Sequence, residues 1–168
     1  MKSGGLYVVM GVSGSGKSLI GAALADALGV EFVEGDRYHP PENVERMARG
    51  IPLTDADRAG WLEALATRIS EAKEAGAGAV VACSALKRAY RDVLRRNVPD
   101  IRFVFLHGPR AVIAKRMEGR RGHFMPTLLL DSQLATLEEP AADERAWVCD
   151  IRESPQRLVA ALLARASA

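Results

Sequence analysis

One segment of the sequence combines residue types and spacing that suit phosphate binding. Residues 11–18 read GVSGSGKS and match G-x-x-x-x-G-K-[ST] at every fixed position. The glycines allow backbone N–H groups to curl around a phosphate, and the helix that follows presents its positive end. A glycine-rich turn that binds nothing is the alternative. Because the segment follows a predicted strand and opens an amphipathic helix, we predict a nucleoside triphosphate site comprising Gly11, Val12, Ser13, Gly14, Ser15, Gly16, Lys17 and Ser18.

Two side chains of this phosphate loop carry charge or bind metal in such sites. Lys17 would place its charge on the β- and γ-phosphates, and Ser18 would hold Mg²⁺. The sequence has no N/T-K-x-D motif to read guanine, and the D-x-x-G match at residues 26–29 falls at the end of the first helix. The strand at residues 79–83 is not followed by an aspartate, as a motor ATPase would need. These features favour a small-molecule kinase, in which a second substrate supplies the attacking hydroxyl.

Asp36 is the candidate for work on that second substrate. It follows a predicted strand, so it lies at the carboxyl edge of the sheet, where ligands of such folds bind. A carboxylate there could orient and deprotonate a hydroxyl, or help to hold Mg²⁺ through water. The alternative is an aspartate that only stabilises a turn or a helix end.

The elements that must position these residues alternate between strands and helices. Apolar runs predict strands at residues 6–10, 31–34, 79–83, 101–106 and 147–151. Helical patterns occupy the intervals. One ends at Gly29, one opens with the possible capping box Thr54-x-x-Asp57, and one runs over 85–96 with Ser84 as cap. Others begin after Gly108-Pro109, near residue 128 and at Ser154-Pro155. This order predicts an α/β fold: a parallel five-stranded sheet of the P-loop NTPase type with helices on both faces.

Composition bounds the class of protein. The chain has 168 residues, which predicts a single domain over 1–168, with 48% hydrophobic and 26% charged residues. A net charge of +2 argues against a nucleic-acid or membrane binder, so any anion site must be local. We find no apolar run of membrane-spanning length and no signal-peptide layout. Cys83 and Cys149 lack metal-binding spacing, which predicts reduced core thiols in a cytoplasmic protein.

Several segments in a fixed order resemble the gluconokinase family, small P-loop enzymes that phosphorylate D-gluconate with ATP. The resemblance runs from about residue 7 to residue 151. It is carried by MGVSGSGKS at 10–18, EGDRYHPPENVERM at 34–47, GIPLTDADRAGWL at 50–62, ACSALKRAYRDVLR at 82–95, RRGHFMPTLLLDSQLATLEEP at 120–140 and ADE at 142–144. It implies the P-loop kinase fold, ATP and Mg²⁺ as cofactors, D-gluconate as the acceptor, and a homodimer.

Gluconate is an anion with many hydroxyl groups, so its pocket needs cations and polar side chains. His39 follows Asp36 by three residues and could face the same cavity. Arg58, and Lys87 with Arg91 four residues apart on one predicted helix face, are candidates for binding the carboxylate. The alternatives are a salt bridge of Arg58 with Asp55 or Asp57, and a solvated helix face for the other two.

A basic, glycine-containing segment at about residues 116–126 predicts a lid over the triphosphate. Its alternative is a charged solvent turn, and the resemblance favours the lid. We expect Arg116 to contact the nucleotide and Arg120 to stabilise the transferring phosphoryl group. His123 and Gln133 are weaker candidates for acceptor binding, whereas His107 is expected to be structural.

Together these features predict transfer of the γ-phosphate of ATP to the terminal hydroxyl of D-gluconate, with Asp36, Lys17 and Arg120 in catalytic roles. One rival is a related kinase with another acceptor, such as shikimate. The other is a nucleotide-binding module without transfer chemistry. A hydrolase is disfavoured because the sequence has no G-x-S-x-G elbow.

Overall fold

The computed structural model describes residues 5–118 and 127–168 and contains the predicted parallel sheet. Its five strands pair in the order β2-β3-β1-β4-β5, and all four pairings are parallel. The strands are β1 (Leu6–Met10), β2 (Glu31–Glu34), β3 (Ala79–Ala82), β4 (Arg102–His107) and β5 (Trp147–Asp150). The α/β prediction is confirmed, and each predicted strand is present to within one residue at either end.

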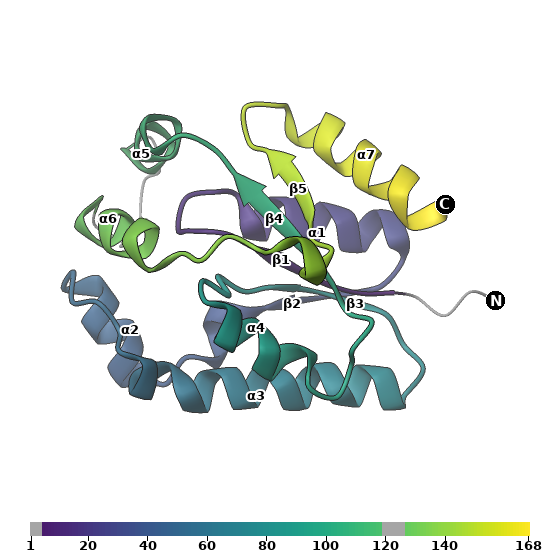
Figure 1. Ribbon diagram of the computed structural model, residues 1–168, viewed down its shortest axis with the longest axis horizontal. Helices are drawn as coiled ribbons and strands as arrows, with labels where there is room; N and C mark the ends of the chain where they lie inside the picture. The colour runs from purple at the N-terminus through teal and green to yellow at the C-terminus, as the bar shows by residue number, and fades with distance from the viewer. Residues whose placement is uncertain (1–4, 119–126) are drawn as a thin grey trace.

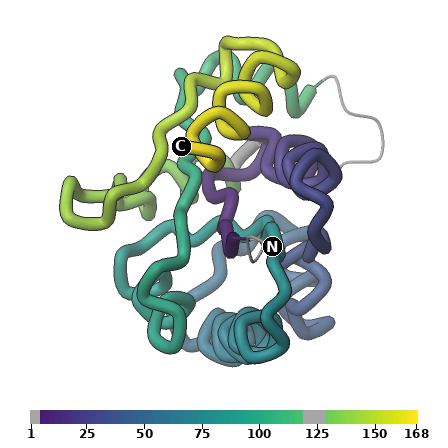
Figure 2. Tube along the Cα trace, turned by 90° about the vertical axis from the view of Figure 1, so that its right-hand side faces the viewer, coloured from purple at the N-terminus to yellow at the C-terminus, as the bar shows by residue number. Residues whose placement is uncertain are grey.

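Helices cover both faces of the sheet (Figures 1 and 2). Helix α1 packs against α7 on one face, and α3 packs against α4 on the other. The helices are α1 (Lys17–Leu28), α2 (Pro41–Ala48), α3 (Asp55–Glu74), α4 (Arg88–Arg95), α5 (Arg110–Glu118), α6 (Thr127–Thr136) and α7 (Pro155–Ser167). Two short 3-10 turns, η1 (Gly35–Tyr38) and η2 (Ala142–Glu144), complete the described elements.

The central strands are buried on both faces, which explains their continuous apolar runs. In β1, Val8, Val9 and Met10 are fully buried, and every residue of β3 is buried. The edge strand β5 instead leaves Val148 exposed. The core therefore lies around β1, β3 and β4, and it fixes the strand ends from which the loops emerge.

The predicted helix ends follow local chemistry in three cases. Gly29 ends α1 in the left-handed conformation, with φ of 71°. Thr54 and Asp57 form the predicted capping box of α3, since each side chain accepts from the other residue's backbone N–H. Ser154 caps α7 by accepting from the Arg157 amide. These signals lie within four residues of the ends that they set.

Two helix predictions differ from the structure. Helix α4 begins at Arg88 rather than at Ala85, and Lys87 rather than Ser84 precedes it. Ala85 has φ of 46°, a left-handed conformation that cannot belong to a helix's first turn. Helix α2 was not predicted at all, although Pro41 at its first position is a typical start.

The strand register brings three chain segments to one edge of the sheet. Val9 of β1 and Glu34 of β2 both lie opposite Ala82 of β3, so these strands end at nearly the same level. Helices α2, α5 and α6 surround this carboxyl end, opposite the end where the termini lie (Figure 1). The phosphate loop, the η1 turn and the segment after β3 therefore meet here.

Both cysteines are free and buried, as the sequence predicts, and burial raises the pKa of the Cys83 thiol to about 12. Within residues 5–118 and 127–168, we find no helix long and apolar enough to cross a membrane. Most of the predicted lid falls outside the described residues, so the single domain with a lid stays a prediction.

Candidate active site

The phosphate loop connects β1 to α1 and has the backbone that its sequence demands. Gly14 and Gly16 have φ of 82° and 99°, in the left-handed region that favours glycine. A Cβ placed on Gly16 would meet no atom within 4 Å, so this part of the loop borders open space. The first turn of α1 therefore directs its backbone N–H groups toward a space that an anion can enter.

Lys17 and Ser18 begin α1 beside this space. The Lys17 ammonium donates to the Val12 carbonyl at 3.1 Å, which folds its side chain back along the loop. The Ser18 hydroxyl donates to the Glu34 carboxylate at the end of β2. Sequence reasoning did not identify Glu34, although an acidic residue directly before Gly35-Asp36 at a strand end was the available signal.

This part of the site fits a bound Mg²⁺. A serine hydroxyl and a carboxylate in contact are the hard oxygen donors that Mg²⁺ prefers. The nearby Ser15 hydroxyl is buried and has no hydrogen-bond partner among the described residues. A buried polar atom without a partner is costly, so this hydroxyl is available to a ligand's oxygen atoms.

A cleft joins the phosphate loop to the predicted acceptor residues. It is lined by Ser13, Lys17, Asp36, His39, Met47, Leu53, Arg58, Trp61, Ser84 and Gln133. Six residues predicted for catalysis, phosphate binding or acceptor binding thus share one cleft: Ser13, Lys17, Asp36, His39, Arg58 and Gln133. Its wall combines two cations, one carboxylate and several uncharged polar groups, which suits a polar anionic ligand beside a phosphate.

Asp36 lies in η1, and two contacts hold that turn against the sheet. A Cβ on Gly35 would come within 2.1 Å of the Ala82 carbonyl oxygen, so only glycine allows this approach to β3. The Trp61 indole N–H donates to the Gly35 carbonyl at 2.8 Å. The helical spacing of the apolar residues Trp61, Leu62, Leu65 and Ile69 predicts Trp61 only as part of the buried face of α3. In the structure it also lines the cleft and fixes the turn that carries Asp36.

His39 is held as a neutral side chain in the cleft wall. Its ring stacks on Trp61 with centroids 4.0 Å apart. Burial lowers the pKa of His39 to about 4, because the opposing effect of Asp36 is smaller and Arg58 adds to the lowering. The Asn43 amide donates to the Asp57 carbonyl at 2.8 Å and contacts His39 Nδ1 at 3.3 Å. Nδ1 must therefore accept, which leaves the proton on Nε2 as a donor.

Arg58 projects from the first turn of α3 into the cleft. Its guanidinium donates to the Tyr90 hydroxyl at 2.9 Å and lies 5.4 Å from that ring's centroid. The salt bridge with Asp55 or Asp57 that was the alternative is not what the structure shows. Asp57 pairs with Arg46 at 2.8 Å, and Asp55 pairs with Lys87 at 3.1 Å.

Lys87 and Arg91 do not line the cleft, contrary to expectation. Lys87 precedes α4, so the two residues do not share a helix face, and its ammonium binds Asp55. Arg91 is fully buried, and its guanidinium is bonded to Glu144 and to the carbonyls of Ala85 and Leu86. Glu144, which is distant in the sequence, pairs with the Arg91 guanidinium in the folded protein. This guanidinium is therefore already bound to a carboxylate of the protein and does not serve the acceptor.

The remaining predicted residues divide between two places. The Gln133 side-chain oxygen accepts from the Ser13 amide at 2.6 Å, so α6 contacts the phosphate loop directly. Arg116 donates to the Ile151 carbonyl and borders a second cavity of about 210 Å³. Arg120 and His123 lie outside the described residues. His107 is half-exposed beside Glu139 and does not line the cleft.

The second cavity also adjoins the phosphate loop. It is lined by Gly14, Ser15, Gly16, Leu19, Ile20, Arg116, Ile151, Glu153, Pro155 and Leu158. Part of this lining, Ile151 and Glu153, comes from the loop after β5. Residues of the phosphate loop thus line both cavities: Ser13 and Lys17 line the first, and Gly14, Ser15 and Gly16 line the second.

Comparisons with known proteins agree with this geometry. A family model described as an AAA domain matches residues 6–140. A gluconokinase of Gluconobacter oxydans is 54% identical over 137 residues, which cover 82% of this chain and 77% of that protein. This chain belongs to the gluconokinase family. Solved structures of the same fold are also among the similar proteins.

Two solved structures resemble the chain along nearly its whole length. A sugar kinase from Janibacter sp. HTCC2649, in an unliganded structure, has a TM-score of 0.92 and 51% identity, over 96% of this chain and 93% of that one. A gluconokinase from Sinorhizobium meliloti has a TM-score of 0.89 and 49% identity, over 99% and 94% of the two chains. The gluconokinase relationship therefore extends to the region after residue 140.

Proposed function

We propose that this protein is an ATP-dependent gluconokinase that phosphorylates the terminal hydroxyl of D-gluconate to give 6-phospho-D-gluconate. The observation that carries the proposal is the cleft in which Lys17 of the phosphate loop meets Asp36, His39 and Arg58. Membership of the gluconokinase family supports the choice of acceptor.

The acceptor end of the reaction uses the cleft's own side chains. Arg58 binds the carboxylate of gluconate, because its guanidinium is held at the cleft by an uncharged tyrosine hydroxyl rather than by a carboxylate. His39 donates from Nε2 to a hydroxyl of the acceptor chain, and Gln133 contributes a further polar group. Asp36 orients the terminal hydroxyl in line with the γ-phosphate and accepts its proton.

The phosphate end uses the loop, its lysine and the residues at the start of α1. Backbone N–H groups of residues 14–18 bind the phosphates of ATP, and Lys17 neutralises charge that develops during transfer. Arg116 and the loop after β5 contact the nucleotide beyond its phosphates. Ser18 with Glu34 would hold Mg²⁺, which supplies positive charge to the phosphate oxygens when bound.

Several assignments remain predictions from the sequence. Arg120 is assigned to the transferring phosphoryl group and His123 to the acceptor, within a lid at about residues 116–126. A cytoplasmic location is likewise proposed, and the two free buried cysteines are consistent with it. A homodimer is proposed from the family resemblance.

An acceptor screen with purified protein tests the proposed function. ADP formation is followed with ATP and Mg²⁺ in the presence of gluconate, other sugar acids or shikimate, and the phosphorylated product is identified by NMR. We expect ADP release that depends on gluconate, with phosphate on the terminal oxygen. ADP release with a different acceptor would mean that this compound, and not gluconate, is the substrate. ATP binding without acceptor-dependent ADP formation would reject the kinase activity. Lys17→Ala is the control for activity from a contaminating enzyme.

A further inference from the structure

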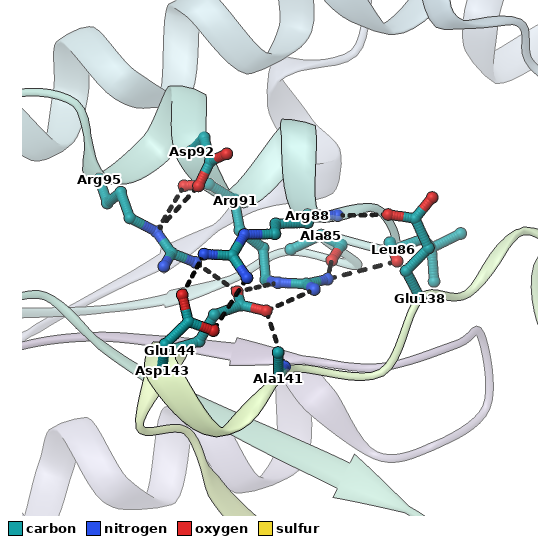
Figure 3. A network of polar contacts seen from close by, with 10 residues as sticks. All are labelled: Ala85, Leu86, Arg88, Arg91, Asp92, Arg95, Glu138, Ala141, Asp143 and Glu144. Carbon is teal, nitrogen blue, oxygen red and sulfur yellow. Dashed lines mark hydrogen bonds and ion pairs between the residues drawn. The ribbon is translucent and has the colours of Figure 1, made fainter.

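A buried ion pair of Arg91 and Glu144 lies outside the lining of the cleft. Arg91 and Glu144 expose 0% and 1% of their side chains. Arg91 Nε and Nη2 donate to the two Glu144 oxygens at 2.7 and 3.0 Å, and Arg95 adds a bond of 2.6 Å to the same carboxylate (Figure 3). The Ala141 amide also donates to it at 2.9 Å. The Glu144 carboxylate therefore forms its hydrogen bonds with groups of the protein itself.

The remaining nitrogen of Arg91 holds a turn of unusual backbone conformation. We call residues 83–87 the post-β3 turn. Arg91 Nη1 donates to the carbonyls of Ala85 and Leu86 in this turn, at 2.8 and 3.3 Å (Figure 3). Ala85 has φ of 46°, which disfavours a residue with a side chain unless its surroundings hold it. The Arg91 guanidinium is one of the groups that hold it.

The post-β3 turn touches three parts of the active site. Ser84 lines the acceptor cleft, and its carbonyl accepts from the Gly11 amide at the start of the phosphate loop at 3.3 Å. The Leu86 carbonyl accepts from the Glu138 amide at 2.7 Å. Glu138 follows α6, the helix that supplies Gln133 to the cleft and to the Ser13 amide. A shift of this turn would therefore move the cleft wall.

We infer that Arg91 and Glu144 are a positioning pair for acceptor binding: they hold the post-β3 turn so that Ser84 and the start of the phosphate loop keep the geometry that gluconate needs. The inference rests on the proposed function. The pair does not touch the acceptor. Glu144 fixes the plane of the guanidinium with two parallel bonds, and that orientation aims Nη1 at the turn's carbonyls.

Arg91→Lys is the discriminating variant. Lysine keeps the positive charge beside Glu144, but its single nitrogen cannot bind the carboxylate and both turn carbonyls in the fork geometry of arginine. Arg88→Lys is the matched control, because Arg88 lies on the same helix and pairs with Asp143 at the surface. Melting curves establish that both variants are folded at the assay temperature.

Two measurements are made on each protein. Steady-state kinetics give KM and kcat for gluconate and for ATP, and hydrogen exchange reports the protection of the Gly11 and Glu138 amides. In Arg91→Lys we expect the KM for gluconate to rise roughly tenfold, since small misplacements at a site are costly, and the KM for ATP to rise by a smaller factor, because only the start of the phosphate loop contacts the turn. Both amides should exchange faster than in wild type. Arg88→Lys should leave both readouts unchanged.

An unchanged KM for gluconate, or unchanged protection of both amides, would overturn the inference. The inference would also be overturned if kcat fell only in proportion to the fraction of folded protein, because that result would indicate a purely structural role. If Arg91→Lys does not fold, Glu144→Gln carries the same measurements, since it retains Arg91 and weakens the bonds that orient it. If the wild type forms no gluconate-dependent ADP, the proposed function fails. The amide exchange then still decides whether Arg91 holds the turn.

Discussion

Arg58 and Arg91 contact parts of the protein at the same end of the sheet, yet their surroundings differ in one decisive respect. Arg58 lines the cleft and donates to a neutral tyrosine hydroxyl. Arg91 is fully buried against the carboxylate of Glu144. Tyr90 links Arg58 to Asp55, because its hydroxyl accepts from Arg58 and donates to Asp55, whereas Glu144 binds Arg91 directly. A guanidinium without a direct ion pair can bind a ligand's carboxylate more readily than one that is already paired. The partner of the guanidinium, and not the residue type, therefore decides whether an arginine can bind a ligand or only holds another part of the protein in place.

The largest expected effect is in the cleft, at Asp36, the group proposed to accept the proton of the reacting hydroxyl. Asp36→Asn should lower kcat by about 10²- to 10⁴-fold, the range for removal of a general base, with ATP binding retained. Steady-state kinetics and equilibrium nucleotide binding measure the two quantities. Arg37→Ala, in the same turn but outside the cleft lining, should leave kcat near wild type. Near-normal turnover by Asp36→Asn would remove Asp36 from the chemistry.

On the buried side the large effect is on stability. Glu144→Ala leaves Arg91 buried without its partner, so we expect the free energy of unfolding to fall by about 3–5 kcal/mol in urea titrations. Asp143→Ala removes an exposed partner of Arg88 and should change stability little. Equal effects of the two substitutions would erase the distinction between the buried pair and the surface pairs.

The buried pair also predicts an acid limit to stability. Burial alone would raise the pKa of Glu144, but bonds from Arg91, the Ala141 amide and Arg95 lower it to about 2. Between its ordinary value of 4.5 and about 2, the unfolded chain takes up a proton that the folded protein does not. The stabilising contribution is therefore present above this window and is lost as the pH falls through it. Urea titrations at stepped pH should show a weaker dependence in Glu144→Gln than in wild type, since other carboxylates with lowered pKa values, such as Asp150, still contribute in the variant.

A smaller effect is expected at Arg58. Arg58→Ala should raise the KM for gluconate about 10- to 100-fold, as loss of a charge-assisted hydrogen bond does, with the KM for ATP nearly unchanged. Arg46→Ala is the matched control, because Arg46 pairs with Asp57 outside the cleft lining. If both arginines gave the same KM for gluconate, the carboxylate would have to be bound elsewhere.

The smallest effect concerns His39. Because its pKa is lowered to about 4, His39 is neutral across the neutral range and should contribute no step near pH 6.5 to the KM for gluconate. Below 6.5 the unfolded chain binds a proton that folded His39 refuses until about pH 4, so stability decreases as pH falls through this window. Denaturation at stepped pH should show that dependence in wild type and a weaker one in His39→Gln. A KM step near 6.5 that disappears in the variant would contradict a neutral His39.

Much of the fold could be predicted because its signals are local. The strands are runs of apolar residues, and Gly29, the Thr54–Asp57 box and Ser154 each set a helix end from within a few residues. The start of α4 could not be predicted in this way. Ala85 is held in the left-handed region by contacts from Arg91, whose own partner Glu144 lies 53 positions away in the sequence.

The candidate site divides along the same line. Asp36, His39 and Arg58 were identified from short motifs, and the structure brings them together with Lys17. Glu34 was missed because its role depends on the register that sets β2 beside the start of α1. Trp61 appeared only as a core residue, since nothing in an apolar periodicity predicts a hydrogen bond to the Gly35 carbonyl.

The phosphate loop, the alternation of strands and helices, and the motifs shared with the gluconokinase family can all be recognised in contiguous stretches of the sequence. Those features depend on residues that are neighbours in the sequence, because such residues set the local backbone conformation and supply the local chemistry. Tertiary contacts decide which arginine lines the cleft and which pairs with Glu144. Ion pairs form between residues that are close in space, so a carboxylate from a distant segment can pair with an arginine that has no partner near it in the sequence.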